Sequence, residues 1–184
     1  MTKGHKDQED QKNLKEQYVF FNTLYQHYYP RVLAYVSFRV GSIENAEDIT
    51  SLVFERALTH IAKLQIPEAA AAWLFRIAQN CVHDYFRHQR PEISLEAFAS
   101  REPAQTLSLE ERVLAEEERR LLLAHVRHLS EREREIIGLK FVAHLTNRQI
   151  ARVLNMPEGT IGSLLYRTLG KLRDALRAGE TQHE

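Results

Sequence analysis

The sequence predicts an all-α fold of two small helical domains joined by a flexible linker, with a helix-turn-helix in the second. Apolar residues recur at spacings of three and four along successive stretches, which is typical of helices packed by one face. Ser or Thr followed by Glu or Gln three residues later marks helix starts at 108, 130 and 146. The periodicity lapses over residues 91–107. We therefore divide the chain into a mobile tail (1–17), a first domain (18–90), a linker (91–107), a second domain (108–178) and a short tail (179–184).

Composition excludes several classes of protein. The chain has 184 residues, 43% of them hydrophobic and 27% charged, which is ordinary soluble usage. Its polar start lacks the apolar core of a signal peptide, and no apolar run approaches a membrane span. We expect a cytoplasmic protein without membrane insertion. The single cysteine, Cys81, excludes an internal disulfide and is expected to pack in a core.

The first domain begins with an aromatic-rich helical stretch over residues 18–40, whose aromatics we assign mostly to the core. Pro30 within it predicts a kink or a restart. Gly41 and Ser42 are typical of a helix end followed by a new helix cap.

The next helix, over residues 44–63, has an acidic face. Its apolar stripe is made by Ala46, Ile49, Val53, Phe54, Ala57 and Ile61. The opposite side carries Glu44, Glu47, Asp48, Ser51 and Glu55. Such a face is either a solvated surface or a docking surface for a protein, and the neighbouring Leu52 favours docking.

A further helix over residues 70–89 follows a break at Pro67 and carries a cationic stripe. The stripe consists of Arg76, Asn80, His83 and Arg87, with Trp73 at its border and Arg90 at its end. Arginines beside aromatic rings suit single-stranded nucleic acid, because cations follow phosphates and rings stack on bases. The alternative is a solvated helix face beside a buried Trp.

The linker separates this domain from four predicted helices, over residues 108–128, 130–142 and two within 146–171. Fully extended, its ~17 residues reach roughly 60 Å, so the two domains can address well-separated DNA segments.

Residues 146–171 predict a helix-turn-helix. Thr146 and Gln149 form a capping-box pair, Asn155 tolerates a left-handed turn, and Pro157 fits the start of a second helix. The buried stripe of that helix is predicted to contain Ile161, Leu165, Leu169, Leu172 and Leu176, with Leu164 and Thr168 beside it. The opposite face carries Ser163, Tyr166, Arg167, Gly170 and Lys171. This arrangement is typical of major-groove recognition, although a hairpin that only packs gives the same pattern.

The net charge indicates that the protein needs a partner to bind DNA tightly. Lys+Arg and Asp+Glu both number 25, so the net charge is zero. Because phosphate attraction supplies most non-specific affinity, a neutral protein should bind DNA weakly by itself.

From about residue 20 to residue 176 the sequence resembles the bacterial sigma factors of the extracytoplasmic function (ECF) group. The segments LYQHYYPRVLAYV, NAEDITSLVFERAL and AWLFRIAQNCVHDYFR resemble region two of that family. LSEREREIIGLKFVAHLTNRQIARVLNMPEGTIGSLLYRTLGKLRDAL resembles region four. The resemblance implies a transcription initiation factor that binds core RNA polymerase and recognises and melts promoter DNA.

The resemblance also implies roles for residues. The polymerase contact would involve Glu47, Asp48, Ser51, Leu52, Phe54 and Glu55. The minus-ten element would be bound by Gln65, Ile66, Pro67, Trp73, Arg76, Asn80, His83, Arg87 and Arg90. The minus-thirty-five element would be read by Thr146, Asn147, Arg148, Glu158, Gly159, Thr160, Gly162, Ser163, Tyr166, Arg167 and Lys171.

Two departures from the family pattern bear on these roles. The recognition helix has Gly162, Ser163, Leu164, Leu165 and Tyr166 where the family often shows Lys-Ser-Arg-Leu-His, so two expected cations are absent. In the acidic helix, Ser51 and Leu52 replace a Gln-Glu pair. We expect weaker phosphate anchoring and a partly apolar polymerase contact.

The alternative function is a helix-turn-helix regulator that binds duplex DNA without sigma activity. An enzyme is not expected, since the chain has no glycine-rich phosphate loop or nucleophile elbow. His125, His128 and His144 lack the further ligands of a recognisable metal set, so we predict no metal and no cofactor. An anti-sigma protein that masks both DNA-facing surfaces is compatible with the linker.

Overall fold

The computed structural model describes residues 3–64, 69–88 and 109–180. Within these ranges all regular elements are helices, which confirms the all-α prediction. The N-terminal half contains α1 (Lys3–Val40), α2 (Ile43–His60), the short 3₁₀ turn η1 (Ile61–Lys63) and α3 (Ala70–His88). The C-terminal half contains α4 (Leu109–Arg127), α5 (Glu131–Ile137), the π-helical segment η4 (Gly138–Val142), α6 (Asn147–Leu154) and α7 (Glu158–Glu180).

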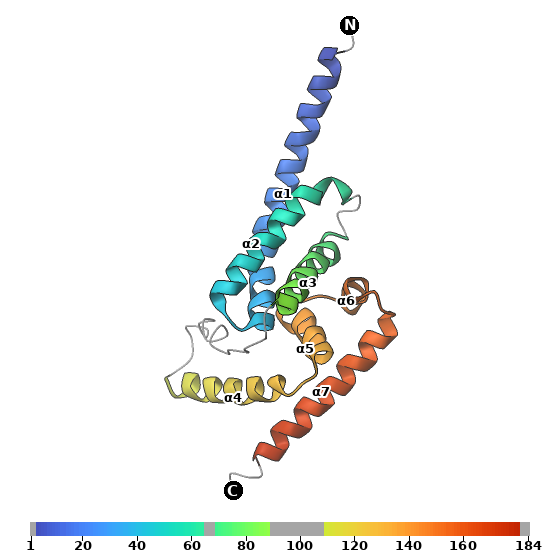
Figure 1. The fold of residues 1–184 in the computed structure, drawn as a ribbon. Helices are drawn as coiled ribbons and strands as arrows, with labels where there is room; N and C mark the ends of the chain where they lie inside the picture. The colour runs from blue at the N-terminus through green and yellow to red at the C-terminus, as the bar shows by residue number, and fades with distance from the viewer. Residues whose placement is uncertain (1–2, 65–68, 89–108, 181–184) are drawn as a thin grey trace.

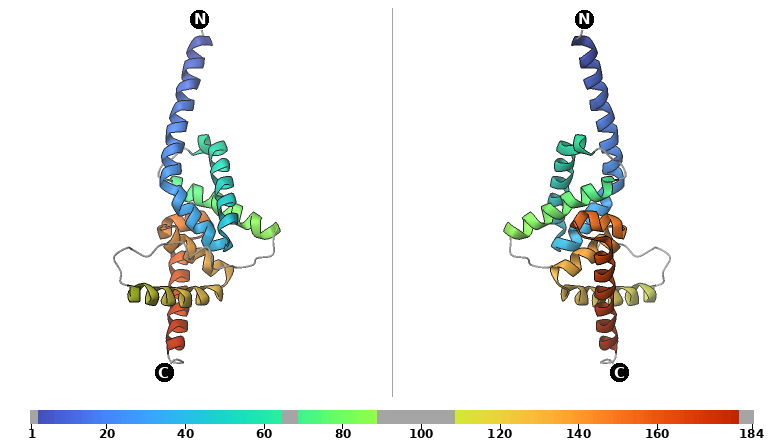
Figure 2. Two further views of the ribbon diagram at one scale, coloured as in Figure 1. Left: turned by 90° about the vertical axis from the view of Figure 1, so that its left-hand side faces the viewer. Right: turned by 90° about the vertical axis from the view of Figure 1, so that its right-hand side faces the viewer.

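The two halves pack directly on each other. Figure 1 shows α5 and α6 next to α3, with α4 and α7 extending away from the N-terminal half. The two turned views show α4 crossing α7 and the long α1 projecting from the opposite end (Figure 2). No described helix combines the length and apolarity needed to cross a lipid bilayer.

Helix α1 begins earlier than predicted. It starts at Lys3, so residues 3–17 are helical where the sequence predicted a tail. Of the two outcomes predicted at Pro30, a kink or a restart, the restart does not occur, because α1 continues through this residue. The many helical turns on both sides of Pro30 hold the chain in place despite the one missing N–H.

The predicted helix caps are present wherever the structure describes them. Ser130 and Thr146 each form a complete capping box, with Glu133 and Gln149 respectively. The Ser42 hydroxyl accepts a hydrogen bond from the Asn45 N–H after Gly41 turns the chain at φ 77°. The cap predicted at residue 108 lies outside the described residues.

The buried apolar side chains of the two halves form one cluster. Val36 and Tyr35 of α1 and Phe75 of α3 belong to it together with Ile136 of α5 and Ile150 of α6. The sequence predicted two small helical domains joined by a linker, and in this structure the buried cores of the two halves meet. The halves approach closely at Gly138, where a Cβ atom would lie 2.8 Å from Phe38 Cδ1.

Phe54 belongs to this core, which corrects its prediction as a polymerase contact. Its side chain is only 4% exposed. Its ring lies 4.8 Å from that of Tyr25 and 5.8 Å from that of Tyr29, measured between centroids. Phe54 therefore packs α2 against α1 and, from the buried side of α2, holds the exposed acidic face in position.

We expect Phe54→Ala to lower the free energy of unfolding by about 3 to 5 kcal/mol, because it leaves a cavity among packed rings. Leu52→Ala, at a position 36% exposed, should change stability by less than about 0.5 kcal/mol. Urea denaturation followed by circular dichroism measures both. Equal losses of stability would show that Leu52, too, is a core residue.

Candidate nucleic-acid interface

The acidic face of α2 is exposed as predicted. Glu47, Asp48, Ser51 and Glu55 all project to solvent, and the Ser51 hydroxyl only donates to the Glu47 carbonyl in its own helix. Leu52 interrupts this polar face. The surface therefore offers carboxylates around one apolar side chain.

The cationic stripe of α3 is also exposed, with Arg76, Asn80, His83 and Arg87 on one side of the helix and Trp73 half-buried at its edge. Arg87 forms an ion pair with Asp84 at 3.2 Å. The other four residues predicted for this site, Gln65, Ile66, Pro67 and Arg90, lie outside the described residues.

Two members of the stripe contact the C-terminal half. The Arg76 guanidinium donates to the carbonyl oxygen of Arg152 in α6. His83 Nε2 lies 3.2 Å from Glu135 Oε1 in α5. Part of the surface predicted to bind a melted strand is therefore engaged in contacts with the C-terminal half of the protein.

The helix-turn-helix forms as predicted from α6 and α7. Asn155 adopts the left-handed conformation at φ 51°, and the Pro157 carbonyl accepts from the Thr160 and Ile161 N–H groups at the start of α7. The exposed predicted residues are Thr146, Arg148, Glu158, Gly159, Ser163, Tyr166, Arg167 and Lys171. Asn147, Thr160 and Gly162 are half-buried.

Tyr166 is the most exposed of the large hydrophobic side chains described on α7, at 77%. Leu169 is 42% exposed, so its assignment to the buried stripe is wrong. It lies one turn beyond Leu165, but the stripe follows Ile161, Leu165, Thr168 and Leu172 instead. The free face of α7 is consequently more apolar than the sequence indicated.

Lys171 has a partner that the sequence did not predict. Its ammonium lies 2.5 Å from Glu133 Oε1, the residue that also completes the capping box with Ser130. The hydrogen bond from Lys171, with those from Ser130, lowers the pKa of Glu133 to about 2. This carboxylate therefore offsets the Lys171 charge within the protein.

Arginines from both halves converge on one cleft. Arg76, Arg148 and Arg152 line a space of about 510 Å³ that Asn155, Met156 and Pro157 complete. Arg152 was not among the predicted site residues. Its position in the last turn of α6 gave no sign that α3 would pack beside it.

Comparison with known proteins identifies the family. Residues 24–92 match the family model for sigma-70 region 2, and residues 119–172 match the model for sigma-70 region 4. The ECF RNA polymerase sigma factor RpoE of Cereibacter sphaeroides is 32% identical over 162 residues, which cover 83% of this chain and 84% of the relative.

The chain belongs to the ECF sigma factors. Another member of the family, BldN of Streptomyces coelicolor, is 35% identical over 83% of this chain, although the match covers 58% of that protein. The fold of this sigma factor is similar to that of RpoE from Bartonella quintana, solved in complex with the anti-sigma factor NepR. The TM-score is 0.65 at 20% identity, over 85% of this chain and 96% of that one.

We expect Lys171→Ala to raise the pKa of Glu133 from about 2 toward its ordinary value of 4.5. A depressed carboxylate pKa stabilises the fold above pH 4.5, and this contribution is lost as pH falls toward 2. The variant should therefore lose stability at pH 7 and little at pH 2. Carboxyl ¹³C NMR titration measures the pKa, and Arg167→Ala serves as the control. An unshifted Glu133 resonance would contradict the ion pair.

Proposed function

We propose that this sigma factor brings core RNA polymerase to promoters, recognises and opens promoter DNA, and leaves catalysis to the polymerase. The observation that carries this proposal is the exposed Arg76 to Arg87 stripe beside Trp73, present in the same chain as a helix-turn-helix with an exposed outer face. A regulator that reads only duplex DNA has no need for a surface suited to single strands. Its partners would be polymerase, duplex promoter DNA and the melted strand.

Docking on polymerase is assigned to the acidic face of α2. Glu47, Asp48 and Glu55 supply charge that repels DNA and attracts a basic protein surface. Leu52 adds an apolar contact at their centre. Phe54 contributes only by holding this face in position from the core.

Promoter opening is assigned to α3. A protein that binds the unstacked strand better than the duplex shifts the equilibrium toward the open form by that difference in affinity. Cations near the phosphates and the ring of Trp73 near the bases would supply the difference. Stacking on an aromatic side chain contributes ~1–3 kcal/mol per base.

Duplex recognition is assigned to α7 and the start of α6. Arg148 and Arg167 would anchor phosphates while Ser163 and Tyr166 face the bases. Gly162 leaves an open position in this face, since a Cβ atom there would meet nothing within 4 Å. With fewer cations on α7, the second region should contribute modest affinity that becomes sufficient once polymerase holds both regions on one promoter.

An anti-sigma protein is a further proposed partner. The RpoE structure with a similar fold is a complex with the anti-sigma factor NepR. The likeness to that protein concerns the fold, so this partner has to be sought in the native host by pull-down.

The protein added to core polymerase should produce promoter-specific transcripts from its own host's DNA, because it supplies the recognition that core polymerase lacks. Run-off transcription with and without the protein measures this. Duplex binding without any promoter-specific initiation would instead support the helix-turn-helix regulator.

Replacing Arg76 and Arg87 with alanine should slow promoter opening about tenfold or more while changing duplex binding less, because the stripe acts on the melted strand. Permanganate reactivity of unpaired thymines measures opening. Arg56→Ala is a matched control, since Arg56 pairs with the same Asp84 as Arg87 does, at 3.3 Å, but lies on α2.

A promoter with a pre-melted mismatch bubble separates the two steps. The double variant should be rescued on this template, because opening is then supplied in advance. Persistence of the full defect on the bubble would show that the two arginines act before or after melting.

A further inference from the structure

We propose that this sigma factor masks its own strand-binding surface: region four closes on α3 without any partner protein, and Glu135 is the latch. The contact differs from an incidental packing of two domains in three respects. It buries charged side chains, it involves residues of the cationic stripe of α3, and it packs closely against a glycine.

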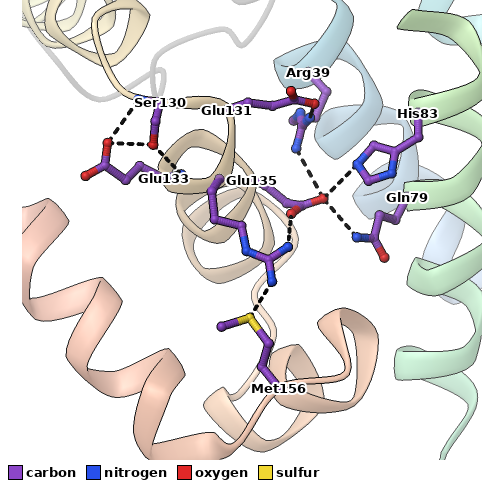
Figure 3. A network of polar contacts seen from close by, with 9 residues as sticks. Arg39, Gln79, His83, Ser130, Glu131, Glu133, Glu135 and Met156 are labelled. Atoms are coloured by element: carbon purple, nitrogen blue, oxygen red, sulfur yellow. Dashed lines mark hydrogen bonds and ion pairs between the residues drawn. The ribbon is translucent and has the colours of Figure 1, made fainter. Parts of the chain in front are cut away.

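Glu135 of α5 is the centre of the latch. Its side chain is 3% exposed and receives partners from three elements (Figure 3). From the N-terminal half, Gln79 Nε2 donates to Oε1 at 3.0 Å, and Arg39 and His83 lie 3.6 and 3.2 Å from the same oxygen. Arg132 of its own helix holds Oε2 at 3.2 Å.

The ion pairs of the latch exist only in the closed form. The Arg39 side chain is likewise 3% exposed and is also paired with Glu131 of α5 at 3.4 Å. Buried ions that lose their partners are unfavourable unless water replaces them. The halves therefore either stay closed with these ion pairs formed or separate so that each charged group becomes hydrated, which makes a two-state element.

A second contact joins α1 to the residues that follow η4. Arg31 of α1 donates from Nε and Nη2 to the Ala143 carbonyl oxygen, at 3.0 and 2.6 Å, and from Nη2 to that of His144 at 3.3 Å. These carbonyls follow η4, where a helical segment ends and a cation is favourable. The guanidinium also lies 5.0 Å from the Tyr28 ring centroid.

The closed form is incompatible with simultaneous reading of both promoter elements. The elements are named for positions about 25 base pairs apart, which is roughly 85 Å of duplex at 3.4 Å per base pair. Here α6 packs directly on α3. Closure also engages Arg76 and His83, so the strand-binding stripe is partly covered. This masking step rests on the function proposed for α3, whereas closure itself does not.

Gly138→Ala is the sharpest test of closure. The added Cβ would meet Phe38 Cδ1 and Cε1 at 2.8 and 2.9 Å, across the interface. At φ −58° alanine fits the local helix, so region four should keep its own fold. Gly170→Ala is the matched control, because its Cβ would come no closer than 3.9 Å to Arg173.

Electron–electron double resonance on the full chain measures closure in the absence of DNA. Spin labels are placed at the exposed Thr59 and Asp174 in a Cys81→Ala background. Wild type and Gly170→Ala should give predominantly one narrow distance with at most a minor longer component, and Gly138→Ala and Glu135→Gln a broad, longer distribution. Phe38→Ala added to Gly138→Ala should restore the narrow distance, which separates opening from misfolding. A broad distribution in the wild type would overturn the proposal.

Masking is measured by fluorescence anisotropy with a labelled mixed-sequence single-stranded 12-mer. If one molecule in ten is open, Gly138→Ala should bind about tenfold more tightly than wild type and Gly170→Ala equally to wild type. Opening by resonance with no gain in oligonucleotide affinity would overturn masking and leave closure standing. Transcription by the opened variant tests the sigma function separately.

Discussion

The fold depends on one buried carboxylate that its own domain cannot satisfy. Glu135 is removed from water on α5, and only one of its four partners, Arg132, comes from that helix. The remaining partners belong to α1 and α3. Because an unpaired buried ion costs several kcal/mol, the position of region four is coupled to the two helices that carry most of region two's core.

This constraint explains how a neutral protein handles a polyanion. The cations that would bind DNA are distributed over α3, α6 and α7, and several are offset by internal partners: Arg87 by Asp84, Lys171 by Glu133. Under the proposed function, affinity would come from presenting both regions together, so the regions would first separate and polymerase would hold them apart.

Local features were predictable because local chemistry determines them. The capping boxes at Ser130 and Thr146 and the left-handed Asn155 follow from residues within one turn of each other. Helical periodicity also gave the exposed stripe of α3. It failed for Leu169, where a Leu at the right spacing lies just outside the buried stripe. Helical spacing predicts which residues lie on the buried face to within about one position. It does not predict which other helix packs on that face.

The contacts between the halves could not be predicted from the sequence, because helical spacing does not identify the partner of a face. Arg39 and Glu135 are 96 positions apart, and nothing near either indicates a partner. For Phe54, by contrast, the apolar stripe over residues 46–61 already predicted burial, and only the resemblance assigned it to the polymerase contact. Long-range pairing depends on how whole helices pack, which periodicity leaves undetermined.

The glycines show why closure is built in rather than incidental. A glycine inside a helix costs about 1 kcal/mol relative to alanine. At Gly162 and Gly170 space is open, so no packing requires this cost. At Gly138 the backbone of region four approaches Phe38 and Tyr35 so closely that no side chain fits. That close approach exists only when the regions are closed. The packing against Phe38 and Tyr35 therefore offsets the helix-propensity cost of Gly138 in the closed form, and opening loses this packing while the cost remains.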